Sequence, residues 1–499
     1  MLPFKTLISI DQDAKTPIYL QISNAIIKLV SNGHITSGQR LPGSRKMASL
    51  LSVNRGTIIT AYEELQAQGW VFISPNQGCF ISEHIPIREA ITLDSGHVHS
   101  PKKISHFPLE NKFPFLQEGK SLPTNKPSIF SFDDGYPDVR LSPLKEISNN
   151  LSFVMKHPRT SSLMNYTQSF DGDLKLREVL KEYLAENRSI HVGVENIFLT
   201  RGSLMGFYLL SQIFIQPDDL VVVSNPGFRE GYMSVKVAGG KLAYVSVDEE
   251  GMCIEEVEAI CKQEQLRAVF IVPHHQYPTT VTLSPSRRMQ LLSLAEKYQF
   301  AIIEDDYDYD FHYSSSPILP IFSADRAGLV AYVGSFSKVL APGLRLGYVV
   351  APENVIHQIS LLSRYIDSFG NTGLERAIAY LITEGYLQRH LKKAVNIYRE
   401  RRDLFCEELH KQIGHQLSFV KPEGGLAVWL KLPPNINYKQ LRQAAQNCQL
   451  SLPASEQFWD PASSIPYVGL RIGFASLAPE RIPAAVEALG KVLSHFPPP

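Results

Sequence analysis

The central part of this sequence alternates short apolar runs with stretches of helical periodicity, and this alternation limits the fold more than any other feature. Apolar runs occupy residues 197–200, 220–223, 268–272, 300–303 and 329–333, and helical patterns cover 204–214 and 287–298. Strands that are covered by helices on both faces lose the polar alternation of an exposed strand. We therefore predict an α/β domain with a mostly parallel sheet, whose functional residues lie beyond the carboxyl ends of the strands.

The last of these runs leads into a lysine with few charged neighbours. Residues 332–348 read YVGSFSKVLAPGLRLGY, in which Lys338 and Arg345 are the only charged residues. Desolvation and a nearby cation lower the pKa of an amine, and a neutral amine forms a Schiff base with an aldehyde. Ser335, Ser337 and Arg345 supply hydroxyls and a guanidinium, which suit a phosphate. Taken alone, the Ser-x-Ser-Lys pattern is weak evidence for this chemistry, because a surface lysine has the same pattern.

The amino-terminal part has the pattern of a winged helix-turn-helix, a small α+β fold. Helical periodicity covers residues 16–30, 44–51 and 55–68, and apolar segments at 71–73 and 79–81 flank a glycine-containing turn. The last helix of such a motif enters the major groove of DNA. Arg40, Arg45, Lys46 and Arg55 form a run of cations without an intervening acid. Such a run suits phosphate contact, although a solvated basic face has the same composition.

The stretch between these two parts shows no periodicity. Residues 84–127 are rich in proline and in irregularly spaced histidines, and they cannot bury a core of their own. We predict a DNA-binding domain over residues 1–83, a linker over 84–127 and the α/β domain over 128–499.

Composition limits the compartment and the partners. The chain has 49 Lys and Arg residues against 49 Asp and Glu residues, so any attraction to nucleic acid is local. The five cysteines are dispersed without a C-x-x-C pair, which fits a reducing compartment. No long uncharged apolar run occurs in the sequence. We expect a cytoplasmic protein without a membrane segment.

Five acids cluster after the apolar run at 300–303. They are Glu304, Asp305, Asp306, Asp308 and Asp310. Clustered oxygen ligands suit magnesium or calcium, but the spacing is not that of an EF-hand. A strand end also suits one functional carboxylate, and an aspartate beside a pyridine nitrogen keeps that nitrogen protonated. We expect this second role and no metal.

Two further segments carry groups that bind anions. Residues 201–204 lead from a predicted strand into a helix, where backbone amides bind phosphate readily, although an ordinary turn has the same pattern. Arg471 lies in the apolar segment 469–474. A buried arginine needs an anionic partner, which is either a ligand carboxylate or a structural acid.

Together these segments resemble two known families. The wording of residues 335–348 resembles the lysine segment of fold-type I aminotransferases that use pyridoxal 5'-phosphate (PLP), in the form found in MocR/GabR-type regulators. The wording of residues 17–22, 38–45, 53–57 and 61–69 resembles the winged helix of GntR-type regulators. The combination of two unrelated modules is more specific than any single motif.

The resemblance to the aminotransferases implies a role for each candidate residue. It assigns the PLP Schiff base to Lys338, the cofactor phosphate to Gly202, Ser203, Leu204, Ser335, Ser337 and Arg345, ring stacking to Phe228, the pyridine nitrogen to Asp305, the ring 3-oxygen to Tyr307 and the ligand carboxylate to Arg471. Tyr166 would reach the phosphate of a neighbouring subunit, which implies a homodimer. The residue that bonds the ring hydroxyl beside Tyr307 stays open among His275, Gln276 and Tyr277.

The resemblance to the GntR-type regulators implies the contacts with double-stranded DNA. They come from Arg45, Asn54, Arg55 and Thr57, with Ser44 and the wing residue Gln77 behind them. The wing departs from the family pattern, because residues 76–80 read NQGCF instead of Gly-x-Gly-Thr-Phe with a nearby basic residue.

The function implied by both resemblances is that of a PLP-dependent transcriptional regulator that senses an amino acid, an amine or PLP itself. The alternative is a catalytically active class I aminotransferase with an appended DNA-binding domain. A third reading treats the large domain as a dimerisation scaffold only. The sequence does not identify the effector, the operator, the sign of regulation or whether transamination turns over.

Overall fold

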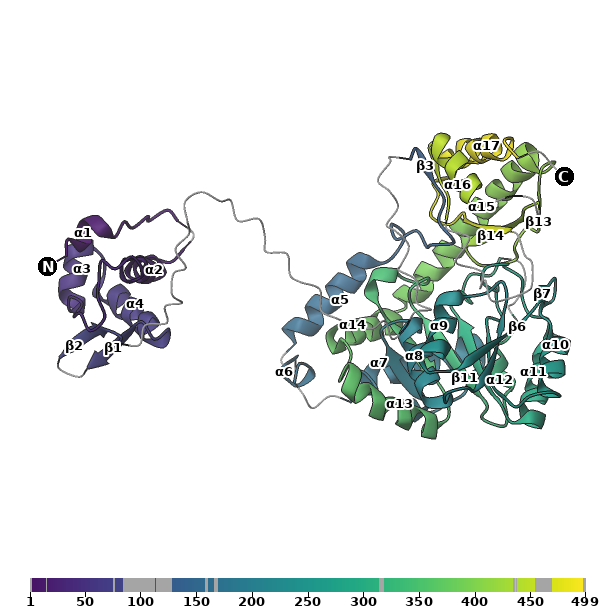
Figure 1. The fold of residues 1–499 in the computed structure, drawn as a ribbon, viewed down its shortest axis with the longest axis horizontal. Helices are drawn as coiled ribbons and strands as arrows, with labels where there is room; N and C mark the ends of the chain where they lie inside the picture. Colours follow the sequence, from purple (N-terminus) through teal and green to yellow (C-terminus); the bar gives the residue numbers. More distant parts are fainter. Residues whose placement is uncertain are drawn as a thin grey trace. The chain divides into compact units, whose positions relative to one another are not determined.

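The computed structural model describes residues 2–14, 16–74, 77–83, 113, 128–157, 160–165, 169–313, 318–433, 436, 438–453 and 469–496. The chain divides into two compact units, residues 1–110 and 111–499, each of which is drawn in Figure 1. Tyr166 and all of the predicted linker except Phe113 lie outside the described residues. The predicted domain limits at 83/84 and 127/128 therefore stay predictions.

The first unit is a winged helix-turn-helix, as predicted. Its elements are α1 (Phe4–Leu7), α2 (Ile18–Ser31), α3 (Ser44–Leu51), α4 (Arg55–Ala67) and the antiparallel hairpin β1 (Val71–Ser74) and β2 (Gly78–Ile81). Ile22, Ile26, Met47 and Ile58 are fully buried and join the three longer helices in one core. The hydroxyl of Tyr62 donates to the carbonyl oxygen of Pro42 at 2.7 Å and so fixes the turn before α3.

The second unit is built on a seven-stranded sheet that is mostly parallel, as predicted. The spatial order is β4 (Ile197–Thr200), β12 (Gly347–Val350), β11 (Val330–Ser335), β10 (Ala301–Asp306), β9 (Leu266–Ile271), β5 (Leu220–Ser224) and β6 (Lys241–Val245). Only β12 runs antiparallel to its two neighbours in this sheet. The strands β6 and β12 were not among those predicted.

Helices bury both faces of this sheet. The helices of this part of the unit are α5 (Leu144–Lys156), α6 (Thr160–Leu163), α7 (Leu174–Arg188), α8 (Ser203–Phe214), α9 (Arg229–Val237), α10 (Ile254–Cys261), α11 (Pro285–Tyr298), α12 (Ile321–Ala324), α13 (Glu353–Ile366) and α14 (Thr372–Thr383), of which α6 packs on α5. Along β11, Tyr332 packs in one core cluster with Leu180 of α7, whereas Val333 packs in another with Phe207 of α8. The apolar runs of the sequence reflect this burial on both faces.

A second, smaller sheet closes the large unit. The long helix α15 (Tyr386–Ile413) leads to the antiparallel strands β13 (Ser418–Phe419), β14 (Ala427–Lys431) and β16 (Gly469–Gly473), with α16 (Tyr438–Asn447) and α17 (Ile482–Leu493) beside them. Here the chain's entry strand β3 (Phe130–Ser131) pairs in parallel with β15 (Leu450–Ser451), far from its sequence neighbour α5 (Figure 1). Phe130 and Ser131 are thus held by Leu450 and Ser451, which come from the carboxyl-terminal part of the unit.

Minor elements complete the described chain. They are the hairpin β7 (Val247–Asp248) and β8 (Gly251–Met252) and three 3-10 turns at Val194–Asn196, Pro342–Leu344 and Pro479–Arg481. None of the helices in the described ranges combines the length and apolar composition that a membrane crossing requires.

Candidate ligand site and candidate nucleic-acid surface

The strand register brings several of the predicted site residues to one edge of the large sheet. Ser335 of β11 pairs with Gly347 of β12, and Gly347 pairs with Thr200 of β4. On the other side of β11, Asp305 of β10 pairs with Val333. Residues that follow β4, β10 and β11 therefore lie around one position, which is where the ligand sites of such sheets occur.

Lys338 lies beyond the end of β11 and is half-buried. Its Nζ donates a hydrogen bond to the carbonyl oxygen of Gly135 at 2.8 Å and lies 4.8 Å from the centre of the Tyr136 ring. Desolvation by burial lowers the pKa of this amine, and the charge of Arg471 acts in the same direction. A lowered pKa increases the neutral fraction of the amine, which is its nucleophilic form.

Asp305 is a buried carboxyl group on which the charge of this lysine acts. Only 3% of the residue is exposed, and among the described residues its Oδ1 has no hydrogen-bond partner. Burial raises the pKa of Asp305 well above its ordinary value, the neighbouring acids add to that rise, and the positive charge of Lys338 opposes it. A buried carboxyl without a partner needs a proton or a cationic group beside it. A protonated ring nitrogen is one group that meets this requirement.

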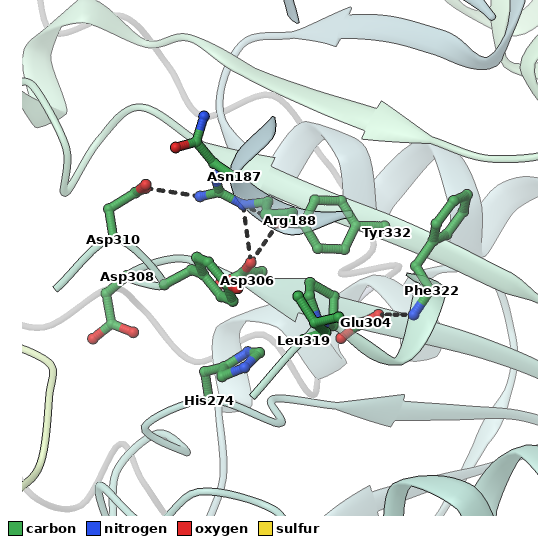
Figure 2. A network of polar contacts seen from close by, with 12 residues as sticks. Asn187, Arg188, His274, Glu304, Asp306, Asp308, Asp310, Leu319, Phe322 and Tyr332 are labelled. Atoms are coloured by element: carbon green, nitrogen blue, oxygen red, sulfur yellow. Dashed lines mark hydrogen bonds and ion pairs between the residues drawn. The ribbon is translucent and has the colours of Figure 1, made fainter. Parts of the chain in front are cut away.

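The four other acids of the cluster each have at least one partner within the protein, and Asp306 Oδ1 and Asp308 Oδ2 are, like Asp305 Oδ1, buried without a hydrogen-bond partner among the described residues. Glu304 accepts the backbone amides of Ile321 and Phe322, each at 2.8 Å. Figure 2 shows Arg188 pairing with Asp306 at 3.5 Å and with Asp310 at 2.7 Å.

The last of the four, Asp308, bonds the ring of His275 at 2.8 Å. No group of three His, Cys, Asp or Glu side chains in the described ranges is placed to hold a metal ion. Glu304, Asp306, Asp308 and Asp310 thus belong to a structural network, and Asp305 stands apart from it.

The candidate phosphate groups lie on the opposite side of β11 from Asp305. Gly202 has a φ of +84° and precedes α8, so the free amides at the start of that helix are available to an anion. Arg345 Nη2 donates to the carbonyl oxygen of Arg201 at 2.7 Å, and a Cβ added to Gly202 would lie 2.9 Å from that same nitrogen. Glycine is therefore required for this close approach.

The two serines of this region are positioned by the turn after β11. The backbone amide of Ser337 donates to Ser335 Oγ at 3.1 Å. Leu204 is 44% exposed, and Ser203 is half-buried at the first position of α8. The side chains of Leu204 and Ser337 make no contact that directs them toward an anion. The backbone amides of these two residues are therefore the better candidates for binding one.

Arg471 is 1% exposed in β16 and donates to neutral oxygens. Its Nε contacts the carbonyl oxygen of Asp134 at 2.8 Å, its Nη1 that of Pro278 at 3.0 Å, and its Nη2 the hydroxyl of Tyr307 at 3.2 Å. These contacts orient the guanidinium without neutralising its charge. The arrangement suits the binding of a ligand carboxylate better than a structural ion pair.

Of the three residues left open beside Tyr307, His275 accepts the Tyr307 hydroxyl with its carbonyl oxygen at 2.6 Å, and Tyr277 contacts two other candidate residues. Its ring centre lies 5.0 Å from Arg471 Cζ and 5.4 Å from the ring centre of Phe228, in an edge-to-face arrangement. Gln276 instead bonds Ser224 Oγ at 3.1 Å, and the His275 ring bonds Asp308.

Sequence reasoning missed the segment 133–136, which contacts both Lys338 and Arg471. Gly135 and Lys338 are separated by 203 positions in the chain. The only local signal was an acidic pair followed by glycine and tyrosine, which does not indicate where in space the segment lies.

The predicted DNA contacts lie on α3, α4 and the hairpin. Arg45, Arg55 and Gln77 are exposed, while Ser44 and Thr57 are half-buried. Arg55 Nε donates to Ser44 Oγ at 3.3 Å, which links the starts of the two helices. The side chain of Asn54 caps α4 by accepting the amide of Gly56 at 2.8 Å. Asn54 therefore has a structural role as a helix cap, and its contact with DNA stays a prediction.

The wing has a basic side chain that comes from outside its own loop. Arg40 forms a β-bridge with Phe80, and its Cζ lies 5.9 Å from the centre of the Phe80 ring. A Cβ added to Gly78 would lie 2.9 Å from Arg40 Nε. Arg40 belongs to the predicted run of cations, but its place beside the wing was not predicted, because only the folded chain brings it there.

Two family models match the chain in separate ranges. Residues 149–489 match the model described as aminotransferase class I and II. Residues 18–81 match the model described as bacterial regulatory proteins of the gntR family.

Similar proteins cover either the whole chain or its large unit. A Rhizobium meliloti protein described as the probable rhizopine catabolism regulatory protein MocR is 24% identical over 97% of this chain and 95% of its own length. A Bacillus subtilis protein described as the uncharacterized HTH-type transcriptional regulator YdfD is 29% identical over 97% of each chain. Aromatic-amino-acid aminotransferase 1 of Thermococcus litoralis is 29% identical over 74% of this chain and 88% of its own length.

Solved aminotransferases share the fold of the large unit. The multiple substrate aminotransferase of Thermococcus profundus has a TM-score of 0.71 at 26% identity, over 77% of this chain and 97% of its own. The kynurenine aminotransferase of Pyrococcus horikoshii, solved in complex with PMP, has a TM-score of 0.69 at 27% identity, over 74% of this chain and 91% of its own.

Proposed function

The chain belongs to the class I and II aminotransferase family and carries a gntR-family unit before that domain, and from this we propose that it is a DNA-binding transcriptional regulator whose large unit binds PLP and senses an amino acid or amine. The observations that carry the proposal are the lowered pKa of the Lys338 amine beyond the end of β11 and the buried carboxyl of Asp305 at the end of β10, whose Oδ1 has no hydrogen-bond partner among the described residues. The two similar regulators that match over nearly the full chain support the regulatory part.

The residues of the site fit the groups of PLP. Lys338 would bond its aldehyde carbon, Asp305 its pyridine nitrogen and Tyr307 its ring oxygen, while Phe228 and Tyr277 would border the ring. The start of α8 and Arg345 would bind the phosphate. When bound, PLP supplies an electrophilic carbon that exchanges one amine for another.

Arg471 would orient an incoming ligand by its carboxylate. A ligand shifts an equilibrium between two states only as far as it binds one of them better. Arg471 touches segment 133–136, residue Pro278 and Tyr307, which come from three separate parts of the unit. A carboxylate bound to Arg471 would therefore change contacts that depend on how these three parts are arranged. We propose that this change in arrangement is how ligand binding alters DNA binding.

We also propose that the chain works as a homodimer. Phe153 and Met155 of α5 and Leu361, Tyr365 and Ile366 of α13 expose large apolar surfaces, with 84% of Tyr365 accessible. Apolar surfaces of this kind mark interfaces between proteins. Tyr166, which the family resemblance assigns to the partner's phosphate site, follows α6 and lies outside the described residues.

A working aminotransferase is the second candidate function. It is favoured by the completeness of the set Lys338, Asp305 and Arg471 and by the two aminotransferases that match the large unit at 27% and 29% identity. Transamination must release a ketoacid and accept a second substrate, whereas sensing requires only binding.

The test compares DNA binding with turnover in the same preparation. The full-length protein, reconstituted with PLP, should change its operator affinity or the bending of the DNA when an amino acid or amine is added. Product formation should be negligible over the time of that response. Many cycles of conversion, with DNA binding indifferent to either substrate, would replace the regulator with the aminotransferase.

A matched pair of variants tests the observation that carries the proposal. Asp305→Asn should weaken PLP retention, because it removes the charge opposite the pyridine nitrogen. Asp310→Asn comes from the same acidic stretch but is turned toward Arg188 and Tyr183. It should change stability more than PLP retention. Equal PLP retention in the two folded variants would contradict the role of Asp305.

A further inference from the structure

The segment 133–136 is fixed on both of its sides to the part of the large unit that α15 and the smaller sheet form. Before it, β3 pairs with β15. Within it, the carbonyl oxygen of Asp133 accepts the amide of Gly473, at the end of β16, at 2.7 Å. After it, Asp138 Oδ2 accepts Arg401 Nη1 of α15 at 2.9 Å. These contacts join the segment to the smaller sheet and its helix.

Lys338 contacts the same segment from the large sheet. It follows β11, and its Nζ donates to the carbonyl oxygen of Gly135 at 2.8 Å and lies 4.8 Å from the centre of the Tyr136 ring. We call these two contacts the lysine bridge. Burial lowers the pKa of this amine and the charge of Asp134 raises it, and the amine donates hydrogen bonds in both its neutral and its charged form. The lysine bridge therefore links the large sheet to the smaller one while the amine is free.

Two other contacts also join these parts, but they do not depend on the state of the lysine nitrogen. The hydroxyl of Tyr277 donates to Asp134 Oδ2 at 2.7 Å. Arg471 of β16 donates from Nη1 to the carbonyl oxygen of Pro278 at 3.0 Å. Neither contact includes the atom that the proposed function bonds to PLP. Among these three links, the lysine bridge is thus the one that loading with PLP changes directly.

Bonding to PLP takes the amine of Lys338 out of the lysine bridge. The aldehyde oxygen of the cofactor leaves as water with the two hydrogens of the neutral amine, and Nζ becomes doubly bonded to the cofactor carbon. An amine ligand reverses this change. Its nitrogen takes over the double bond to the same carbon, the bond from that carbon to Nζ breaks, and two hydrogens pass from the ligand nitrogen to Nζ. The exchange needs no oxidant or reductant, and it returns a free amine to Lys338.

We propose that the lysine bridge is open while Lys338 is bonded to PLP and closed in the two states in which its amine is free. Those states are the protein without PLP and the protein whose PLP carries an amine ligand. The inference rests on the proposed function, because it takes Lys338 as the residue that bonds PLP. It adds a rule of regulation: loss of the cofactor and arrival of an amine ligand put segment 133–136 in the same state and act in the same direction.

Hydrogen exchange of the full-length protein tests the lysine bridge. The amides of Gly135 and Tyr136 report on it, since each donates to Asp133 Oδ1 at 2.8 Å within the segment. The samples are protein without PLP, PLP-loaded protein, and loaded protein treated with methoxyamine, a small primary amine that displaces the lysine and has no carboxylate for Arg471. Loading should speed the exchange of these amides about tenfold, because a charge-assisted hydrogen bond is lost, and methoxyamine should restore slow exchange.

Two controls separate the bond to Lys338 from the mere presence of the cofactor. Borohydride delivers a hydride to the cofactor carbon, and Nζ takes up a proton, so that a single bond holds the lysine permanently. Methoxyamine should then leave the exchange rate unchanged. Lys338→Ala lacks the amine, so its segment should exchange fast even without PLP. Should this variant fail to fold, the wild-type samples with and without methoxyamine decide the question.

A matched pair of tyrosine variants tests the aromatic half of the lysine bridge. Tyr136→Leu removes the ring beside the amine and should speed exchange of the Gly135 amide about threefold in protein without PLP. Tyr298→Leu is the control, because the Tyr298 ring on α11 meets Lys297 Nζ at the same 4.8 Å. It should leave the exchange of the segment unchanged.

The outcomes separate the lysine bridge from the function on which it rests. Equal exchange with and without PLP overturns the lysine bridge, and so does exchange that stays fast after methoxyamine has displaced the lysine. Slow exchange in folded Lys338→Ala without PLP overturns it as well. In each case bound PLP and a response to amino acids would leave the proposed function standing. Absence of bound PLP after reconstitution contradicts the proposed function itself.

Discussion

The two units of this chain carry their candidate functional residues in opposite ways. In the winged helix, Arg40, Arg45 and Arg55 are exposed. In the large unit, Asp305 and Arg471 are nearly inaccessible, at 3% and 1% exposure. Exposed cations attract a polyanion at long range and lose little hydration in the free protein, whereas buried charges cost stability until a ligand pairs them.

The comparison shows why the two surfaces respond differently to the environment. Salt screens exposed charges strongly and buried charges weakly. Burial shifts pKa values, and the strongly shifted acids of the described ranges, such as Glu304, Asp305 and Asp306, lie in the large unit. DNA binding should therefore follow ionic strength, and ligand binding should follow pH.

The largest expected effect is the loss of covalent cofactor attachment on changing one buried residue. Borohydride treatment of the PLP-loaded protein should fix the cofactor to Lys338, and Lys338→Ala should abolish this labelling while keeping the fold. Peptide mapping locates the label, and thermal unfolding checks the fold. A label on another lysine would remove the basis for placing the ligand site at β11.

The second largest effect is a change of stability with pH that comes from the buried acid Glu304. Burial raises the pKa of Glu304 from 4.5 to about 7. The folded state then keeps a proton that the unfolded state releases, so the contribution of Glu304 is complete below pH 4.5 and declines as pH rises to about 7. Relative to Glu304→Gln, the wild type should lose about 3 kcal/mol of unfolding free energy across that window.

Urea denaturation between pH 4.5 and 8 measures this difference. Glu487→Gln removes an exposed acid of α17 and serves as the control, with no change in slope across the same window. Parallel stability curves for wild type and Glu304→Gln would show that Glu304 ionises normally. Buried acids would then not explain a difference in pH dependence between the two units.

A smaller effect is expected for single cations of the winged helix. Arg55→Ala should cost about 1–3 kcal/mol on the specific site, if this side chain reads a guanine edge. Arg45→Ala, as a phosphate contact, should weaken binding to all sequences similarly. Titrations with specific and nonspecific duplexes distinguish the two. Unchanged affinity in both variants would move the DNA surface away from α3 and α4.

The smallest effect concerns Arg40 on the wing. If its guanidinium contacts one phosphate, Arg40→Ala should reduce the slope of log affinity against log salt by about 1, with little change in sequence preference. Lys28→Ala, which removes a cation from α2, controls for net charge. A slope that falls equally in both variants would assign the effect to overall charge and not to the wing.

Local patterns predicted those parts of the fold whose causes are local. The helix α3 has the predicted limits, because Gly43 has non-helical backbone angles directly before it and Ser52 ends it in the left-handed conformation. The apolar runs predicted strands β4, β5, β9, β10 and β11 because helices cover both their faces. The strand β6 was missed because much of it is only half-buried and it begins at the exposed Lys241.

The site was predictable only in part for the same reason. Lys338, Asp305 and Arg471 each lie at a strand or strand end that their own neighbourhood reveals. Asp134, Gly135 and Arg40 take their places through contacts with distant parts of the chain. Such contacts leave no periodicity in the sequence. Asn54 shows the reverse case, because a residue expected to touch DNA already has a local task as a helix cap.

The parallel pairing of β3 with β15 has a mechanical consequence. The chain enters the large unit through this pairing and continues directly into segment 133–136, which holds Lys338 and Arg471. A pull on the chain at residue 128 is resisted first by the hydrogen bonds between β3 and β15 and then by those of Asp133 and Gly135. The stretch that anchors the start of this chain segment is thus continuous with the stretch that contacts Lys338 and Arg471.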